Sequence, residues 1–159
     1  MTTCYMLIGV PGSGKTTYRD KMFKMRNNIF YASTDDIIES ISYNYGVTYS
    51  SFFKILYPFA LEIMTRDINR YMTNEHPFVW DQTNIDMKSR GPKIKMLKDN
   101  HYIVKAVAFD PPPIDVLKER LNNRPGKLIP WNVMESMLKK YEPPCMSEGF
   151  ETVEIITHA

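Results

Sequence analysis

The sequence feature that most constrains the fold is a glycine-rich segment near the N-terminus. Residues 9–16 read Gly-Val-Pro-Gly-Ser-Gly-Lys-Thr and match the phosphate-binding pattern G-x-x-x-x-G-K-[ST] at every fixed position. The apolar run at residues 5–10 predicts a strand before this segment, and the residues from Lys15 to about Arg26 predict a helix after it. A strand, a glycine-rich turn and a helix, in that order, form the setting in which this pattern binds phosphates.

The chemistry of this segment predicts how it would bind a nucleoside triphosphate. Glycines allow successive backbone N–H groups to turn inward around phosphates, and the positive N-terminal end of the next helix adds to the attraction. We expect Lys15 to reach the β and γ phosphates of ATP and the Thr16 hydroxyl to bind Mg²⁺. The nucleotide-binding residues expected in the loop are Gly9, Pro11, Gly12, Ser13, Gly14, Lys15, Thr16 and Thr17.

Strand and helix patterns alternate along the rest of the chain. Further strands are expected at residues 29–33, 77–81, 103–109 and 152–156, with helices between them at residues 34–43, 50–74, 87–99, 113–122 and 131–140. Such alternation is typical of an α/β fold in which helices flank a parallel sheet, with ligands at the carboxyl ends of the strands. A length of 159 residues fits one domain, residues 1–159.

Composition excludes several other classes of protein. The net charge of +2 is well short of that of a strongly basic nucleic-acid-binding domain, and no apolar run is long enough to cross a membrane. The first residues lack the basic region of a signal peptide, so we expect a cytoplasmic protein with Cys4 and Cys145 both reduced. His76 and His101 stand alone, without the spacing of metal ligands.

Two acidic residues follow the second predicted strand directly. Asp35 lies where this strand becomes a helix, which places its carboxylate at the sheet edge that also carries residues 9–16. We expect Asp35 to accept the proton of an acceptor hydroxyl during phosphoryl transfer. The alternatives are that Asp35 only caps the helix, or that Asp36 has the catalytic role.

A second polar cluster ends the strand predicted at residues 77–81. Asp81 is followed by Gln82, Thr83 and Asn84, and we expect Asp81, Thr83 and Asn84 to bind the acceptor or a magnesium-bound water. The alternative is a turn held by local side-chain hydrogen bonds.

Basic residues occur in two further places. Arg120 and Arg124 enter a segment with glycine and proline, and we expect residues 120–131 to form a lid in which both arginines contact the phosphates of ATP and Arg124 assists catalysis. One predicted helix also carries a basic series, for which a solvated face is favoured over a surface that binds a nucleic-acid backbone. That series is Lys88, Arg90, Lys93, Lys95 and Lys98.

Over most of its length the chain resembles the P-loop polynucleotide 5′-hydroxyl kinases. The resemblance rests on residues 9–16, Asp35, residues 81–84, Arg120 with Arg124, and the stretch Tyr-Glu-Pro-Pro at residues 141–144. It implies ATP and Mg²⁺, a sheet of the adenylate-kinase type, Asp35 as general base, and a kinase domain without a 3′-phosphatase domain.

The chain departs from this family at two positions. The bacteriophage enzyme it resembles has arginine just before the catalytic aspartate and again three residues after it, where this chain has Thr34 and Ile38. The second arginine is thought to hold a phosphate of the acceptor.

Three functions remain open from the sequence. The leading hypothesis is transfer of the ATP γ-phosphoryl group to the 5′-hydroxyl of DNA or RNA. Ile38 favours the alternative of another hydroxyl acceptor, such as a nucleoside, a hydroxymethylated base in DNA, a sugar or an antibiotic. The third is a nucleotide-dependent switch or assembly ATPase, which the paired arginines disfavour.

Overall fold

The computed structural model describes residues 1–157, and a single parallel sheet organises them. Its five strands run in the order β2-β3-β1-β4-β5, and every neighbouring pair is parallel. The strands are β1 (Thr3–Ile8), β2 (Phe30–Ala32), β3 (Phe78–Asp81), β4 (Ile103–Phe109) and β5 (Thr152–Ile156). The predicted α/β class with a parallel sheet is therefore confirmed.

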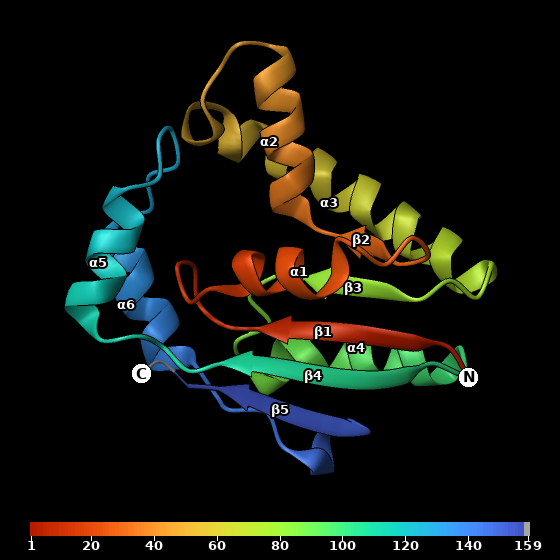
Figure 1. The fold of residues 1–159 in the computed structure, drawn as a ribbon. Helices are drawn as coiled ribbons and strands as arrows, with labels where there is room; N and C mark the ends of the chain where they lie inside the picture. The colour runs from red at the N-terminus through yellow and green to blue at the C-terminus, as the bar shows by residue number, and fades with distance from the viewer. Residues whose placement is uncertain (158–159) are drawn as a thin grey trace.

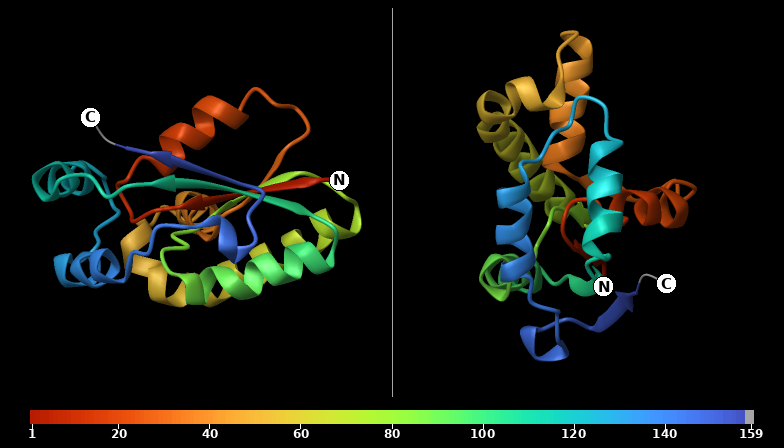
Figure 2. Two further views of the ribbon diagram at one scale, coloured as in Figure 1. Left: turned by 90° about the horizontal axis from the view of Figure 1, so that it is seen from below. Right: turned by 90° about the vertical axis from the view of Figure 1, so that its left-hand side faces the viewer.

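Helices cover both faces of the sheet and one of its edges. They are α1 (Lys15–Phe23), α2 (Thr34–Asn44), α3 (Tyr49–Thr73), α4 (Met87–Asp99), α5 (Ile114–Asn122), α6 (Trp131–Lys140) and the short 3₁₀ helix η1 (Met146–Glu148). Helix α1 packs on one face, whereas α3 and α4 pack on the other (Figure 1, Figure 2). Helices α5 and α6 lie beyond the carboxyl ends of the strands (Figure 1).

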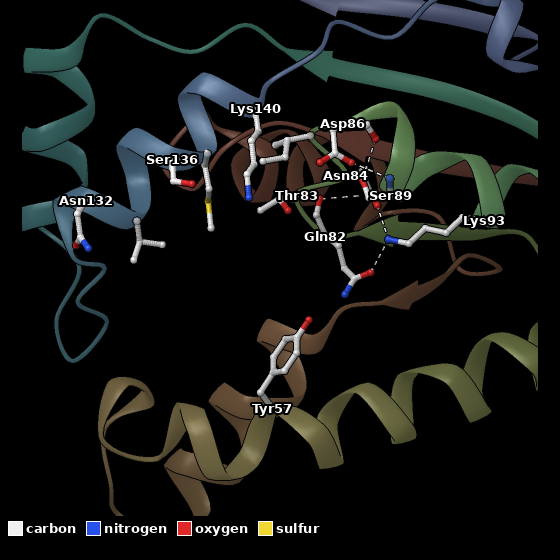
Figure 3. A pocket seen from close by; sticks show the side chains of 13 residues that line it. Tyr57, Gln82, Thr83, Asn84, Asp86, Ser89, Lys93, Asn132, Ser136 and Lys140 are labelled. Atoms are coloured by element: carbon white, nitrogen blue, oxygen red, sulfur yellow. Dashed lines mark hydrogen bonds between the residues drawn. The ribbon is translucent and has the colours of Figure 1, made fainter.

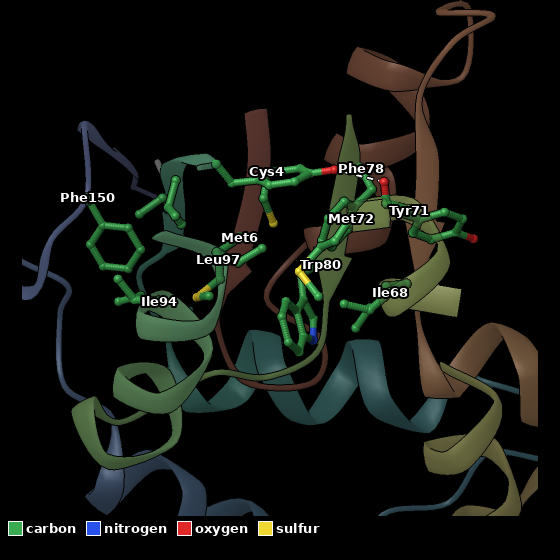
Figure 4. Close-up of a cluster of buried hydrophobic side chains, with 14 of the residues drawn as sticks. Cys4, Met6, Ile68, Tyr71, Met72, Phe78, Trp80, Ile94, Leu97 and Phe150 are labelled. Carbon is green, nitrogen blue, oxygen red and sulfur yellow. Dashed lines mark hydrogen bonds between the residues drawn. The ribbon is translucent and has the colours of Figure 1, made fainter. Parts of the chain in front are cut away.

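Alternating residues of the strands build a core on each face. In β1, Met6 and Ile8 pack in the larger cluster beneath α3 and α4, whereas Leu7 packs in the smaller cluster beneath α1. Aromatic side chains fill much of the larger cluster, where Phe78 and Trp80 of β3 lie beside Met72 of α3 (Figure 4). Strands that are buried on both faces in this way read as nearly continuous apolar runs.

Two sequence-based expectations need correction. Strand β1 ends at Ile8 instead of residue 10, because the Gly9 N–H leaves the sheet and donates to the Thr83 carbonyl at 2.9 Å. The face of α4 expected to be solvated holds Arg90, which is fully buried and pairs with Glu148 at 2.7 Å. Burial of Arg90 connects α4 to the segment before β5, a contact that sequence spacing does not reveal.

Two further features concern the cysteines and the length and apolarity of the helices. Cys4 is buried and Cys145 is exposed, and both are free thiols. Among residues 1–157, no helix combines the length and the apolarity that crossing a membrane requires.

Candidate active site

The glycine-rich loop connects β1 to α1 at the carboxyl edge of the sheet. Gly12 and Gly14 adopt φ values of 81° and 101°, a left-handed conformation that favours glycine. A Cβ atom on Gly12 would also lie 2.9 Å from the Leu117 side chain of α5. The loop is thus shaped by left-handed turns and supported from behind by α5.

Lys15 points back into this loop. Its ammonium donates to the carbonyl oxygens of Gly9 at 2.6 Å and Val10 at 3.0 Å. Burial lowers the pKa of Lys15 to about 8, although the nearby carboxylates of Asp81 and Asp35 act in the opposite direction. A bound phosphate anion would therefore favour the charged form of Lys15.

Asp35 lies in the first turn of α2, and two partners from other parts of the chain hold its carboxylate. The Tyr49 hydroxyl of α3 donates to it at 2.7 Å, and the Lys127 ammonium donates at 2.9 Å. Burial acts to raise the pKa of Asp35, but Lys127 and Tyr49 outweigh it and hold this pKa below its usual value. Ser33, not Asp35, caps the helix, since its side chain accepts from the Asp36 N–H at 3.2 Å. The carboxylate of Asp35 is ionised, oriented and half exposed, as a proton acceptor must be.

A buried arginine that sequence analysis missed joins the residue after Asp35 to the end of β3. Arg19 of α1 donates to Asp36 at 2.7 Å and to Asp81, the last residue of β3, at 2.9 Å. Burial raises the pKa of Asp81, while Lys15 and Arg19 act to lower it. The signal in the sequence is spacing, because Arg19 follows Lys15 by one helical turn and shares its face of α1.

The connection between α5 and α6 lies over the site and contacts α3. Arg120 donates to the Gly12 carbonyl of the loop at 3.1 Å, and the Gly126 carbonyl accepts from the Ser50 N–H at 3.0 Å. The charge of Arg124 acts on Lys15, lowering its pKa. Residues 120–131, expected to form a lid, therefore contact both the phosphate loop and α3, and Lys127 among them reaches Asp35, a contact the sequence did not suggest.

The polar residues after β3 have two kinds of surroundings, since one is buried in the fold and others line a pocket. The Asn84 side chain is buried and donates to the Leu7 carbonyl at 2.8 Å, so in this structure it joins β3 to β1. Thr83, by contrast, lines an open pocket together with Gln82 (Figure 3). Lys93 of α4, expected on a solvated face, instead donates to Gln82 at 2.8 Å and to Asn84 at 2.5 Å.

The loop and its surroundings fit a magnesium–nucleotide complex. The first N–H groups of α1 have no acceptor within the helix, which suits them to phosphate oxygens. Among residues 1–157 no group of three or more acidic, histidine or cysteine side chains could hold a metal alone. The exposed Thr16 hydroxyl suits Mg²⁺ that is bound mainly by phosphates and water.

Comparison with protein families identifies the fold. Residues 5–144 match the sequence profile AAA_33, described as an AAA domain. The chain belongs to this family. A comparison with curated proteins found no match.

Solved structures of kinases share this fold. A kinase candidate from Chloroflexus aurantiacus superimposes with a TM-score of 0.72 at 13% identity, over 98% of this chain and 88% of that one. A chain of the Pnkp1/Rnl/Hen1 RNA repair complex gives 0.67 at 18% identity, over 87% of this chain and 43% of that one. A sugar kinase from Janibacter gives 0.61 at 18% identity, over 99% and 86%. The chain therefore has a fold that these solved kinase structures share.

Proposed function

We propose that this protein transfers the γ-phosphoryl group of ATP to the 5′-hydroxyl of DNA or RNA. The observation that carries the proposal is the position of Asp35 at the edge of the sheet that also holds the phosphate loop. Its carboxylate is fixed by Tyr49 and Lys127 and leaves about half of its surface free for a hydroxyl group.

Each charged side chain then has a distinct task. Asp35 accepts the proton of the attacking hydroxyl, while Lys15 and Arg124 neutralise charge that develops on the transferred and leaving phosphates. Arg120 holds the lid to the loop through its bond to Gly12. Mg²⁺, with Thr16 among its ligands, would neutralise further charge on the phosphate oxygens. Phosphoryl transfer depends mainly on such positioning and electrostatics.

The polynucleotide acceptor is supported by two resemblances. The order of motifs along the chain is similar to that of the polynucleotide 5′-hydroxyl kinases, and one superimposed structure belongs to an RNA repair complex. We also propose that Asp81, Thr83 and Asn84 contact the acceptor. Asn84 would do so by exchanging its hydrogen bonds to the Leu7 and Gln82 carbonyls for bonds to the acceptor.

A second candidate is a kinase for another hydroxyl acceptor, such as a sugar. The residue three positions after Asp35 is Ile38, which is apolar and fully buried. This position therefore presents no cation to an acceptor. Several side chains that line the pocket beside the loop are uncharged hydrogen-bonding groups, which suit a polyol equally well; they are Gln82, Thr83, Ser89, Asn132 and Ser136.

A transfer assay separates the two candidates. The protein is incubated with Mg²⁺, ATP labelled at the γ phosphate and either 5′-hydroxyl DNA and RNA oligonucleotides or a panel of nucleosides and sugars. The proposal predicts label on the oligonucleotides, at a lower KM than on any nucleoside. Label on a sugar or nucleoside, with none on oligonucleotides, would replace it by the second candidate.

A further inference from the structure

A pocket of about 550 Å³ lies between α3, the segment after β3, and α6 (Figure 3). It is adjacent to the phosphate loop, because the carbonyl of its lining residue Thr83 accepts the Gly9 N–H. Tyr57 of α3 forms the wall opposite Gln82 (Figure 3). A molecule in this pocket therefore lies between the loop and the helix whose Tyr49 orients Asp35.

The Gln82 amide is oriented by its neighbours with its donors toward the pocket. Its Oε1 accepts from the Trp80 indole N–H at 3.0 Å and from the Lys93 ammonium at 2.8 Å. Both partners can only donate, so the oxygen must face them and the amide nitrogen must face away. The two N–H groups of Gln82 point into the pocket (Figure 3).

A cation faces the same space from α6. The side chain of Lys140 extends into the pocket, and among residues 1–157 it forms no ion pair (Figure 3). Lys93 also lines the pocket, but its ammonium already donates to two side-chain oxygens. The one acidic lining residue, Asp86, uses its carboxylate to accept the Ser89 N–H at 2.7 Å. Donors and positive charge therefore exceed acceptors and negative charge.

We propose that this pocket binds a phosphate group of the acceptor through the Gln82 amide and the Lys140 ammonium. The inference rests on the proposed function: in a polynucleotide whose 5′-hydroxyl meets Asp35, the bound group would be the phosphate that follows the first nucleoside. A phosphate oxygen accepts from both donors, and a cation adds strength to such hydrogen bonds. An uncharged sugar could accept a hydrogen bond from Lys140 but would gain little from its charge.

Equilibrium binding tests this inference without requiring catalysis. Adenosine 3′-monophosphate and adenosine are titrated separately into the protein saturated with Mg²⁺ and a non-hydrolysable ATP analogue, and heat is measured by calorimetry. The 3′-phosphate should tighten binding by about tenfold or more, as expected for a charge-assisted hydrogen bond. Equal binding of both compounds, or binding of neither, would overturn the inference.

Two variants identify the donors. Lys140→Met should reduce the preference for the phosphate to about twofold or less, while Lys139→Met, which changes the exposed neighbour outside the pocket, should keep it. Gln82→Glu keeps oxygens for Trp80 and Lys93 but replaces the donors with negative charge, so it should also abolish the preference. An unchanged preference in both Lys140→Met and Gln82→Glu contradicts the assignment. Failure of the transfer assay with intact phosphate preference would instead reject only the proposed reaction.

Discussion

The Lys127 ammonium of the lid lies 2.9 Å from the Asp35 carboxylate at the start of α2. The same ammonium contacts Glu39 at 2.9 Å, and it lies over the Tyr49 ring at 4.3 Å from the centroid. The lid thus carries a cation directly to the carboxylate proposed as the general base. This contact helps to hold the pKa of Asp35 below its usual value.

Removal of Lys127 should shift the acid side of the pH–rate profile. Asp35 must be ionised to accept a proton, and Lys127 helps to hold its pKa below the usual value. In Lys127→Met the pKa of Asp35 should rise. As the pH is lowered, kcat/KM should therefore begin to fall at a higher pH than in the wild type. Lys54→Met, which removes an exposed charge from α3, should leave the profile unchanged. An identical acid limb in Lys127→Met would show that Asp35 does not control it.

Substitution of Asp35 should impair chemistry more than nucleotide binding. In Asp35→Asn the side chain keeps its size but cannot accept a proton, so kcat should fall by about 10² to 10⁴. The affinity for ATP, measured by calorimetry, should change little. Glu39→Gln is the matched control because Glu39 shares Lys127 with Asp35 but does not begin the helix. An equal loss of kcat in Asp35→Asn and Glu39→Gln would indicate that both substitutions act by removing an ion pair with Lys127.

Arg19 should be essential for stability. Arg19→Met removes the ion-pair partner of the buried Asp81 carboxylate, which should lower the free energy of unfolding by about 3–5 kcal/mol. The measurement is urea denaturation. Lys95→Met removes an exposed ion pair with Asp99 and should cost less than about 1 kcal/mol. Comparable effects of the two substitutions would contradict the importance assigned to the buried cluster.

Nucleotide binding should take up a proton at alkaline pH. Burial lowers the pKa of Lys15 to about 8 in the free protein. A bound triphosphate favours the charged ammonium and raises this pKa again, so ATP affinity should fall as the pH rises through that value. At about one pH unit above it, the binding enthalpy should depend on the ionisation enthalpy of the buffer. Lys21→Met should retain this dependence; its absence in the wild type would show that Lys15 stays charged.

Local pattern predicted the fold and the loop well. The glycine positions within residues 9–16 predict the left-handed turns of the loop. The alternation of apolar runs with helical periods predicts the parallel sheet. The partners of Asp35 were not predictable in the same way. Lys127 is 92 residues away along the chain, and no local period encodes such a contact.

The sequence pattern also did not predict which charged residues of α4 are buried. Arg90 and Lys93 fit a basic helical face as well as Lys95 does, yet the packing of α4 buries Arg90, partly buries Lys93 and leaves Lys95 exposed. The difference lies in their partners, Glu148 and the residues after β3, which come from other segments. Similarly, Asn84 was expected to meet substrate, and here it bonds to Leu7 of the central strand.

The most direct test of the account is a product analysis that follows both halves of the reaction. A 5′-hydroxyl oligonucleotide is incubated with ATP and Mg²⁺, and ADP and the oligonucleotide termini are quantified together by chromatography and mass spectrometry. The account predicts one 5′-phosphate for each ADP formed, with both lost in Lys15→Met and strongly slowed in Asp35→Asn. ADP that accumulates without a 5′-phosphorylated product would contradict it and indicate a nucleotide-hydrolysing switch.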